Sequence, residues 1–203
     1  MRALTNFQQM YATRDCKKRA LEPYTKSPHV NVALTGFMGA EKSTTGKRLA
    51  RLLGIPFVDS DAELERIHGP IADIFGARGE REFRRLEAEM IDRLSADGPR
   101  VIAVGGGAVM DSANRRVLRR RGVIVHLKVT PAVAWRRVAH RKHRPLLGER
   151  PDLGHVASLL AERAGAYADC DYMVHVDHRS PLGAARAIAR WYRTHQPQPA
   201  DPA

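Results

Sequence analysis

Short apolar runs alternate with longer segments of helical periodicity along most of this chain. The apolar runs are typical of buried strands, and we expect strands at 30–34, 55–58, 101–104, 123–129 and 172–176. Helical spacing predicts helices at 42–54, 62–68, 71–95, 112–121, 131–140, 153–168 and 181–193. This alternation predicts an α/β fold with a mostly parallel sheet. Ligands of such sheets bind at the carboxyl ends of the strands.

The pattern also divides the chain. Residues 1–28 are a basic N-terminal extension without a clear strand or long helix, and we expect a loosely docked arm there. One ordered domain is expected at 29–193. Within it, residues 141–154 are charged and contain Gly and Pro, which predicts a mobile loop. Residues 194–203 are rich in Pro and Gln and are expected to be disordered.

Composition indicates the cellular compartment that we expect for this chain. The longest apolar candidate, residues 101–110, is short and glycine-rich, so we expect no membrane span, which needs about 18 apolar residues. No apolar stretch follows Arg2, as a signal peptide would require. Cys16 and Cys170 lie far apart and lack metal-ligand spacing. We therefore expect a cytoplasmic protein without disulfides or zinc.

The charge balance indicates an anionic partner. The chain has 34 Lys and Arg against 22 Asp and Glu, a net charge of +12. Nucleic acid is one such partner, and ATP together with a carboxylate substrate is another. Only 6% of the residues are aromatic and no aromatic-rich binding motif is present, which counts against nucleic acid.

A phosphate-binding pattern follows the first predicted strand. Residues 36–43 match G-x-x-x-x-G-K-[ST] in all but one position, between a predicted strand and a predicted helix. Backbone N–H groups at the start of that helix would hold phosphates. Lys42 would reach the β- and γ-phosphates of ATP, and the Ser43 hydroxyl would bind Mg²⁺.

The exception is Glu41, which stands where the second glycine of this loop is expected. Glycine serves where the backbone approaches a ligand closely or takes an unusual φ. Glutamate adds a Cβ and a negative charge beside the triphosphate, so we expect Glu41 to depress ATP affinity. Lys42 is a candidate partner for Glu41 when no nucleotide is bound. The alternative is a glycine-bearing turn that binds no ligand.

Five further motifs resemble those of the shikimate kinase family. They are Asp59-Ser60-Asp61, Phe83-Arg84-Arg85-Leu86-Glu87, Gly105-Gly106-Gly107-Ala108, Arg144-Pro145-Leu146-Leu147 and Glu162-Arg163-Ala164. Their order and spacing match over residues 30–193. The resemblance implies a three-layer α/β/α P-loop kinase fold with a central parallel sheet and a mobile lid at 141–154. It also implies Mg-ATP-dependent phosphorylation of the shikimate 3-hydroxyl, on the pathway to chorismate and aromatic amino acids.

The same resemblance assigns substrate and catalytic roles. It makes Lys42, Asp61 and Arg144 catalytic, with Asp61 orienting the attacking hydroxyl and Arg144 closing onto the transferring phosphoryl. Arg84, oriented by Glu87, would bind the shikimate carboxylate, because the guanidinium fork matches a carboxylate. The implied substrate-binding residues are Asp61, Arg84, Gly105, Gly106, Gly107 and Arg163.

Nucleotide and metal residues follow in the same way. Ser43 and Asp59 would hold Mg²⁺, and two residues apart on a strand, Asp59 and Asp61 would face one cleft. The implied nucleotide-binding residues are Gly36, Gly39, Ala40, Glu41, Lys42, Ser43, Thr44, Arg137, Arg144, Arg179 and Pro181. Without the resemblance, Asp59 and Asp61 are also compatible with helix capping. Arg84 and Glu87 are likewise compatible with a solvated surface pair.

The chain departs from the family at Gly165 and Ala166, where Pro and Leu are common. We expect a monomer that binds shikimate and ATP. Two alternatives stay open: a shikimate-binding relative impaired in nucleotide binding, and a kinase for another polyol acid such as gluconate.

Overall fold

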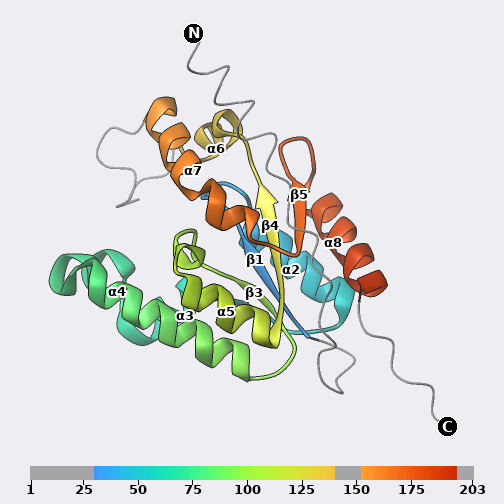
Figure 1. The fold of residues 1–203 in the computed structure, drawn as a ribbon, viewed down its shortest axis with the longest axis horizontal. Helices are drawn as coiled ribbons and strands as arrows, with labels where there is room; N and C mark the ends of the chain where they lie inside the picture. The colour runs from blue at the N-terminus through green and yellow to red at the C-terminus, as the bar shows by residue number, and fades with distance from the viewer. Residues whose placement is uncertain (1–29, 140–151, 196–203) are drawn as a thin grey trace.

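The computed structural model describes residues 30–139 and 152–195, which form one sheet flanked by helices (Figure 1). All strand pairs are parallel, in the order β2-β3-β1-β4-β5. The strands are β1 (Asn31–Thr35), β2 (Phe57–Asp59), β3 (Val101–Ala103), β4 (Gly122–Lys128) and β5 (Tyr172–His175). The prediction of a central parallel sheet is therefore confirmed.

Helices cover both faces of this sheet. Helices α2 and α8 pack together on one side, whereas α4 packs on α3 and α5 on the other, which gives three layers (Figure 1). The helices are α2 (Lys42–Leu53), α3 (Ser60–His68), α4 (Ile71–Ala96), the 3-10 turn η1 (Ala108–Met110), α5 (Ser112–Arg121), α6 (Pro131–Val138), α7 (Leu153–Ala168) and α8 (Pro181–His195). In the part of the chain that the structure describes, no helix is both long and apolar enough to cross a bilayer.

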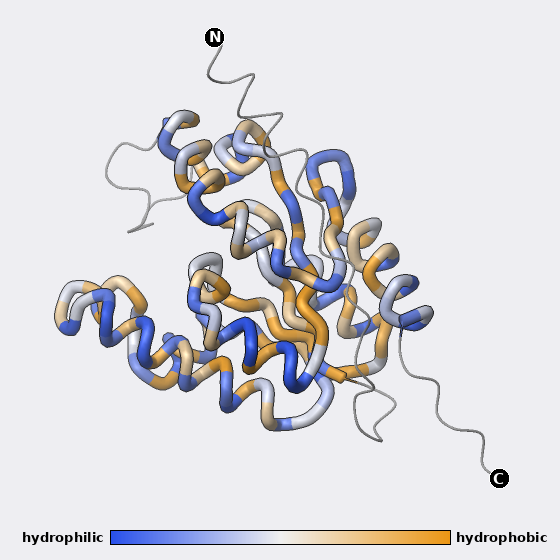
Figure 2. The backbone as a smooth tube through the Cα atoms, in the orientation of Figure 1, coloured by the Kyte–Doolittle hydropathy of each residue, from blue (hydrophilic) through white to orange (hydrophobic). Residues whose placement is uncertain are grey.

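The central strands β1 and β4 have the burial expected of a sheet that lies between two layers of helices. Every residue of β1 and β4 is buried, as expected for parallel strands covered on both faces. Figure 2 shows these strands largely in orange and the arginine-rich α5 largely in blue. The hydrophobic core therefore lies between the sheet and the two helix layers.

Three local features differ from the sequence-based expectation. Helix α4 is interrupted at Gly79, whose φ of 77° and ψ of 171° are not helical. The short turn η1 follows the triple glycine and was not predicted. Helix α8 continues to His195, so the first two residues of the expected tail are helical.

Strand register brings the chemically important segments to one edge. Leu34 of β1 and Asp59 of β2 both pair with Ala103 of β3, so these three strands end at nearly the same level. The phosphate loop follows β1 and the triple glycine follows β3. The sheet thus presents the phosphate loop, Asp59 and the glycine loop side by side.

Glu41 has the backbone conformation that glycine favours. It directly precedes α2, with φ 61° and ψ 37°, in the left-handed region. Over residues 30–139 and 152–195, it is the only non-glycine residue with positive φ. A side chain costs about 1–2 kcal/mol in this conformation, because Cβ approaches the backbone. The loop therefore keeps a glycine-type conformation although the glycine is absent.

We expect Glu41→Gly to raise the free energy of unfolding by about 0.5–1 kcal/mol, since relief of the backbone strain exceeds the added entropy of the unfolded chain. Glu41→Gln removes the charge but keeps Cβ, so it should give no comparable gain. Urea unfolding of the three proteins measures the difference. Equal stabilisation by Gln and Gly would show that charge, not backbone conformation, is responsible.

Candidate functional site

The phosphate loop wraps around the start of α2. The Lys42 Nζ donates to the Gly36 carbonyl oxygen at 2.9 Å, which folds the lysine back over the loop. Gly36 has no room for a side chain, because its Cβ would lie 2.7 Å from the Leu127 carbonyl oxygen. The first N–H groups of an α-helix have no acceptor within the helix, so the start of α2 can bind an anionic ligand. This is the geometry that a phosphate-binding loop requires.

A cavity of about 320 Å³ opens beside this loop. It brings together most of the residues expected to bind nucleotide and metal. Its lining residues are Met38, Gly39, Glu41, Lys42, Ser43, Thr44, Asp59, Asp61, Val104 and Arg137. Ala40 belongs to the loop itself and is fully buried, and its N–H donates to the Phe37 carbonyl oxygen at 3.1 Å.

Ser43 and Asp59 meet in this cavity. The Ser43 hydroxyl donates to the Asp59 Oδ2 at 2.5 Å. The Asp59 Oδ1 accepts from the backbone N–H of Asp61 at 3.1 Å, so the same carboxylate also caps α3. Capping and metal binding are therefore compatible at Asp59. Hydroxyl and carboxylate oxygens suit Mg²⁺, which uses few protein ligands and adds water and phosphate oxygens.

Asp61 was expected to lie on a strand, and this prediction is wrong. It belongs to the first turn of α3, because the cap at Asp59 starts the helix immediately after β2. Its carboxylate nevertheless reaches the sheet edge, and a Cβ on Gly105 would lie 2.7 Å from the Asp61 Oδ1. Asp61 lines the phosphate-side cavity and also a second cavity.

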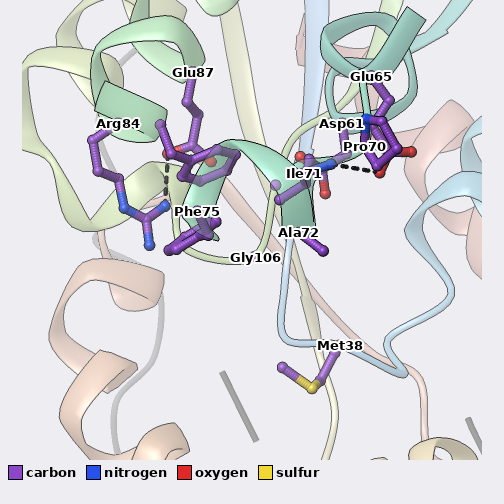
Figure 3. Close-up of a pocket in the computed structure, with 13 residues that line it drawn as sticks. Met38, Asp61, Glu65, Pro70, Ile71, Ala72, Phe75, Arg84, Glu87 and Gly106 are labelled. Atoms are coloured by element: carbon purple, nitrogen blue, oxygen red, sulfur yellow. Dashed lines mark hydrogen bonds and ion pairs between the residues drawn. The ribbon is translucent and has the colours of Figure 1, made fainter. Parts of the chain in front are cut away.

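The second cavity, of about 530 Å³, lies between α3, α4 and the glycine loop (Figure 3). Its polar side chains are those of Asp61, Glu65, Arg84 and Glu87. Its apolar wall was not predicted from the sequence and consists of Met38, Pro70, Ile71, Ala72, Phe75 and Phe83. The signal that could have found this wall is the apolar face at the start of α4.

Arg84 and Glu87 form a partly buried ion pair rather than a solvated one. The Arg84 Nη1 donates to the Glu87 Oε2 at 2.8 Å, and the Glu87 side chain is only 3% exposed. Burial raises the pKa of Glu87, although the Arg84 guanidinium opposes the shift. Burial alone would lower the pKa of Arg84, but the Glu87 and Glu80 carboxylates outweigh it and raise that pKa. Glu87 thus holds a permanently charged arginine at the cavity wall.

The glycine loop leaves space for these side chains. A Cβ on Gly105 would also lie 2.7 Å from the Glu87 Oε1, and a Cβ on Gly107 would lie 2.8 Å from the Arg84 Nη1. At Gly106 the nearest atom would be 3.6 Å away, so this glycine is not needed for space. Glycine is therefore required for space at positions 105 and 107, but not at position 106.

Arg163 lies behind the site. It is 9% exposed, stands 5.7 Å above the Phe37 ring, and is not among the residues that line the larger cavity. Its neighbour Tyr167 donates from its hydroxyl to the Gly106 carbonyl oxygen at 2.7 Å. Burial raises the pKa of Tyr167 to about 12, against the opposing effect of Arg163. Tyr167 therefore stays protonated and fixes the glycine loop.

His126 supports this tyrosine from below. The two rings stack at 4.6 Å between centroids, and the His126 Nδ1 lies 3.3 Å from the Thr35 Oγ1. Burial, helped by nearby Lys128 and Lys42, lowers the pKa of His126 to about 3. The imidazole is neutral at physiological pH and packs against the Tyr167 ring.

Of the remaining predicted residues, only some reach the phosphate loop or a cavity. Arg137 reaches the phosphate loop, where its Nη1 lies 3.5 Å from the Glu41 Oε2. Arg179 and Pro181 stand after β5, at the start of α8, and line neither cavity. Arg144 and most of the expected lid at 141–154 lie outside the described residues.

Comparison with known proteins agrees with this geometry. A family model described as shikimate kinase matches residues 38–193. The shikimate kinase of Geobacter sulfurreducens is 42% identical over 167 residues, covering 82% of this chain and 92% of that protein. The Rhizobium meliloti shikimate kinase is 41% identical over 145 residues, covering 71% and 76%.

Solved structures give the same result. Shikimate kinase from Acinetobacter baumannii in complex with shikimate has a TM-score of 0.77 and 34% identity, covering 80% of this chain and 92% of that one. A gluconokinase from Sinorhizobium meliloti, with a TM-score of 0.57 and 20% identity, shares the fold. The match over most of its length, together with the phosphate loop and the two adjoining cavities, places this chain in the shikimate kinase family.

Proposed function

We propose that this protein is a kinase that transfers the γ-phosphoryl group of ATP to the 3-hydroxyl of shikimate. The observation that carries the proposal is the position of Asp61, which lines both the phosphate-loop cavity and the cavity that contains Arg84. A hydroxyl held in the second cavity would lie beside a phosphoryl group held in the first. Relatives of this chain that bear the name shikimate kinase support the choice of acceptor.

The nucleotide would occupy the smaller cavity. Backbone N–H groups at the start of α2 would hold the phosphates, and Lys42 would exchange its bond to the Gly36 oxygen for one to the β- and γ-phosphates. Ser43 and Asp59 would hold Mg²⁺. When bound, that ion would neutralise charge on the β- and γ-phosphates.

Shikimate would occupy the larger cavity. Arg84 pairs with the buried Glu87 at 2.8 Å and with the exposed Glu80 at 3.1 Å, and it would exchange Glu80 for the substrate carboxylate, which its guanidinium fork matches. Arg163 is the proposed second arginine. Because it is buried behind the glycine loop, it would act either directly at the cavity floor or through Tyr167 and Gly106. The apolar wall around Phe75 would pack against the ring of the acid.

The transfer itself needs little covalent assistance. The attacking hydroxyl oxygen forms a bond to the γ-phosphorus, and the bond from that phosphorus to the β,γ-bridging oxygen breaks, releasing ADP. Asp61 orients the hydroxyl and accepts its proton. Lys42 and Arg144 offset charge on the transferring group, because positioning and electrostatics dominate this reaction.

A coupled assay of ADP release with shikimate as acceptor tests the proposal, with gluconate measured in parallel. ADP release that depends on shikimate is expected. Release with gluconate alone would identify a different polyol-acid kinase. Tight shikimate binding without any release would identify the nucleotide-impaired relative. Either of these results would overturn the proposed activity.

We expect Arg84→Ala to weaken shikimate binding by roughly 10- to 150-fold, because a hydrogen bond to a charged group contributes about 1.5–3 kcal/mol. Arg163→Ala should cause a loss in the same range. Calorimetry without nucleotide measures both. The matched control is Arg85→Ala, since Arg85 pairs with Glu82 on the exposed side of the same helix. Undiminished binding in both Arg84 and Arg163 variants would contradict their assignment to the carboxylate.

For Arg144 we predict a loss of turnover rather than of binding. Its charge is needed chiefly on the transferring phosphoryl group, so Arg144→Ala should lower kcat strongly while shikimate affinity changes little. Steady-state kinetics combined with shikimate titration separates the two effects. A variant with normal kcat would remove Arg144 from the mechanism.

A further inference from the structure

Glu41 has an arginine beside it that changes how the altered phosphate loop should behave. We propose that Arg137 is the counter-charge that makes Glu41 acceptable at the nucleotide site, and that Arg137 acts on nucleotide affinity through that carboxylate. The inference rests on the proposed function only in taking Mg-ATP as the nucleotide.

The contact joins two elements that are far apart in sequence. The Arg137 Nη1, on α6, lies 3.5 Å from the Glu41 Oε2 at the start of α2. The Arg137 side chain is 22% exposed and that of Glu41 is 36% exposed, so solvent screens the pair only in part. The glutamate carboxylate is thereby held toward α6.

Arg137 is fixed independently of Glu41. Its Nη1 also donates to the Gly39 carbonyl oxygen at 2.9 Å, and its Nη2 donates to the Val176 carbonyl oxygen at 3.2 Å. These acceptors belong to the phosphate loop and to the end of β5. Because backbone atoms from two segments hold the guanidinium, we infer that it stays beside Glu41 with or without nucleotide.

The charge of the cavity shows why the arginine is needed. Among its described lining residues, three are carboxylates (Glu41, Asp59 and Asp61) and two are cations (Lys42 and Arg137). Without Arg137, three carboxylates would face the triphosphate with one lysine. The repulsion from Glu41 would then be uncompensated. A glycine at position 41 would carry no charge, and Arg137 offsets the negative charge that glutamate brings there.

A different arrangement predicts the opposite coupling. If Arg137 left Glu41 to bind the phosphates, Glu41 would compete with the nucleotide. Removing Glu41 would then free Arg137, and Arg137→Ala would cost more affinity in the Glu41→Gly background than in the wild type. The sign of the coupling therefore distinguishes a fixed counter-charge from a competing contact.

The test is a double-mutant cycle on Mg-ATP affinity, measured by calorimetry without shikimate. It compares the wild type, Arg137→Ala, Glu41→Gly and the double variant. In the presence of Glu41, Arg137→Ala should weaken Mg-ATP binding about 10- to 100-fold; in the Glu41→Gly background the loss should be about threefold or less. Equal losses in both backgrounds, or a larger loss in the Glu41→Gly background, would overturn the inference.

Further variants separate charge from structure. Arg137→Lys keeps the charge and should recover most of the affinity. Arg137→Gln keeps an amide donor for the Gly39 oxygen but has no charge. It should lose the Mg-ATP affinity predicted for Arg137→Ala in both backgrounds, and it replaces the alanine variant in the cycle if that variant folds poorly. Arg136→Ala removes an exposed arginine from the same helix and should leave Mg-ATP affinity unchanged. A loss as large in Arg136→Ala would point to net charge and contradict the pairing.

The outcomes also separate this inference from the proposed activity. Binding needs no turnover, so absent ADP release with an intact cycle would refute only the activity. If the wild type bound no Mg-ATP but Glu41→Gly did, the nucleotide site would stand and the counter-charge inference would fail. If neither bound Mg-ATP, both would fail.

Discussion

The missing side chain of Gly105 determines how the two cavities meet. The carboxylates of Asp61 and Glu87 each approach within 2.7 Å of the position that its Cβ would take. Its backbone N–H donates to the buried Ser60 hydroxyl at 3.1 Å, which ties the loop to the start of α3. Tyr167 holds the next residue from α7. Two helices therefore fix one short loop, and any added volume there would push the acidic groups of both cavities apart.

In the described part of the chain, several arginines are used in local ion pairs. Arg115 and Arg119 both bind Asp169, at 2.8 and 2.9 Å, and Arg119 also donates to the backbone there. Arg85 pairs with Glu82 at 2.8 Å. These contacts connect helices and strengthen helix surfaces without requiring a polyanion.

The features that depend on local pattern could be predicted from the sequence. The strands and helices follow from hydrophobic periodicity, and the phosphate loop follows from glycine, lysine and serine spacing. The position of Asp61 was wrong because the cap at Asp59 starts α3 at once, which a strand pattern does not reveal. The contact of Glu41 with Arg137 joins residues almost a hundred positions apart, so only the fold could bring them together. The apolar wall was missed although most of it lies on one short stretch of α4, because the sequence does not show which face of that helix borders a cavity.

Both cavities combine an arginine with a glutamate, but the two pairs are built differently. At the substrate side, Glu87 is buried at 3% exposure and holds Arg84, whose side chain is 32% exposed at the cavity wall. Glu87 is the fixed partner, and the second partner of Arg84, Glu80, is 61% exposed and can give way to an anion. At the nucleotide side, backbone oxygens fix Arg137 and the more exposed Glu41 is the partner that it restrains. The first pair offers a positive charge to a ligand, whereas the second cancels a negative charge that would repel one. The anchored member of each pair therefore determines its role. A fixed acid leaves the arginine able to bind an anion, whereas a fixed arginine only offsets the acid so that an anion can bind nearby.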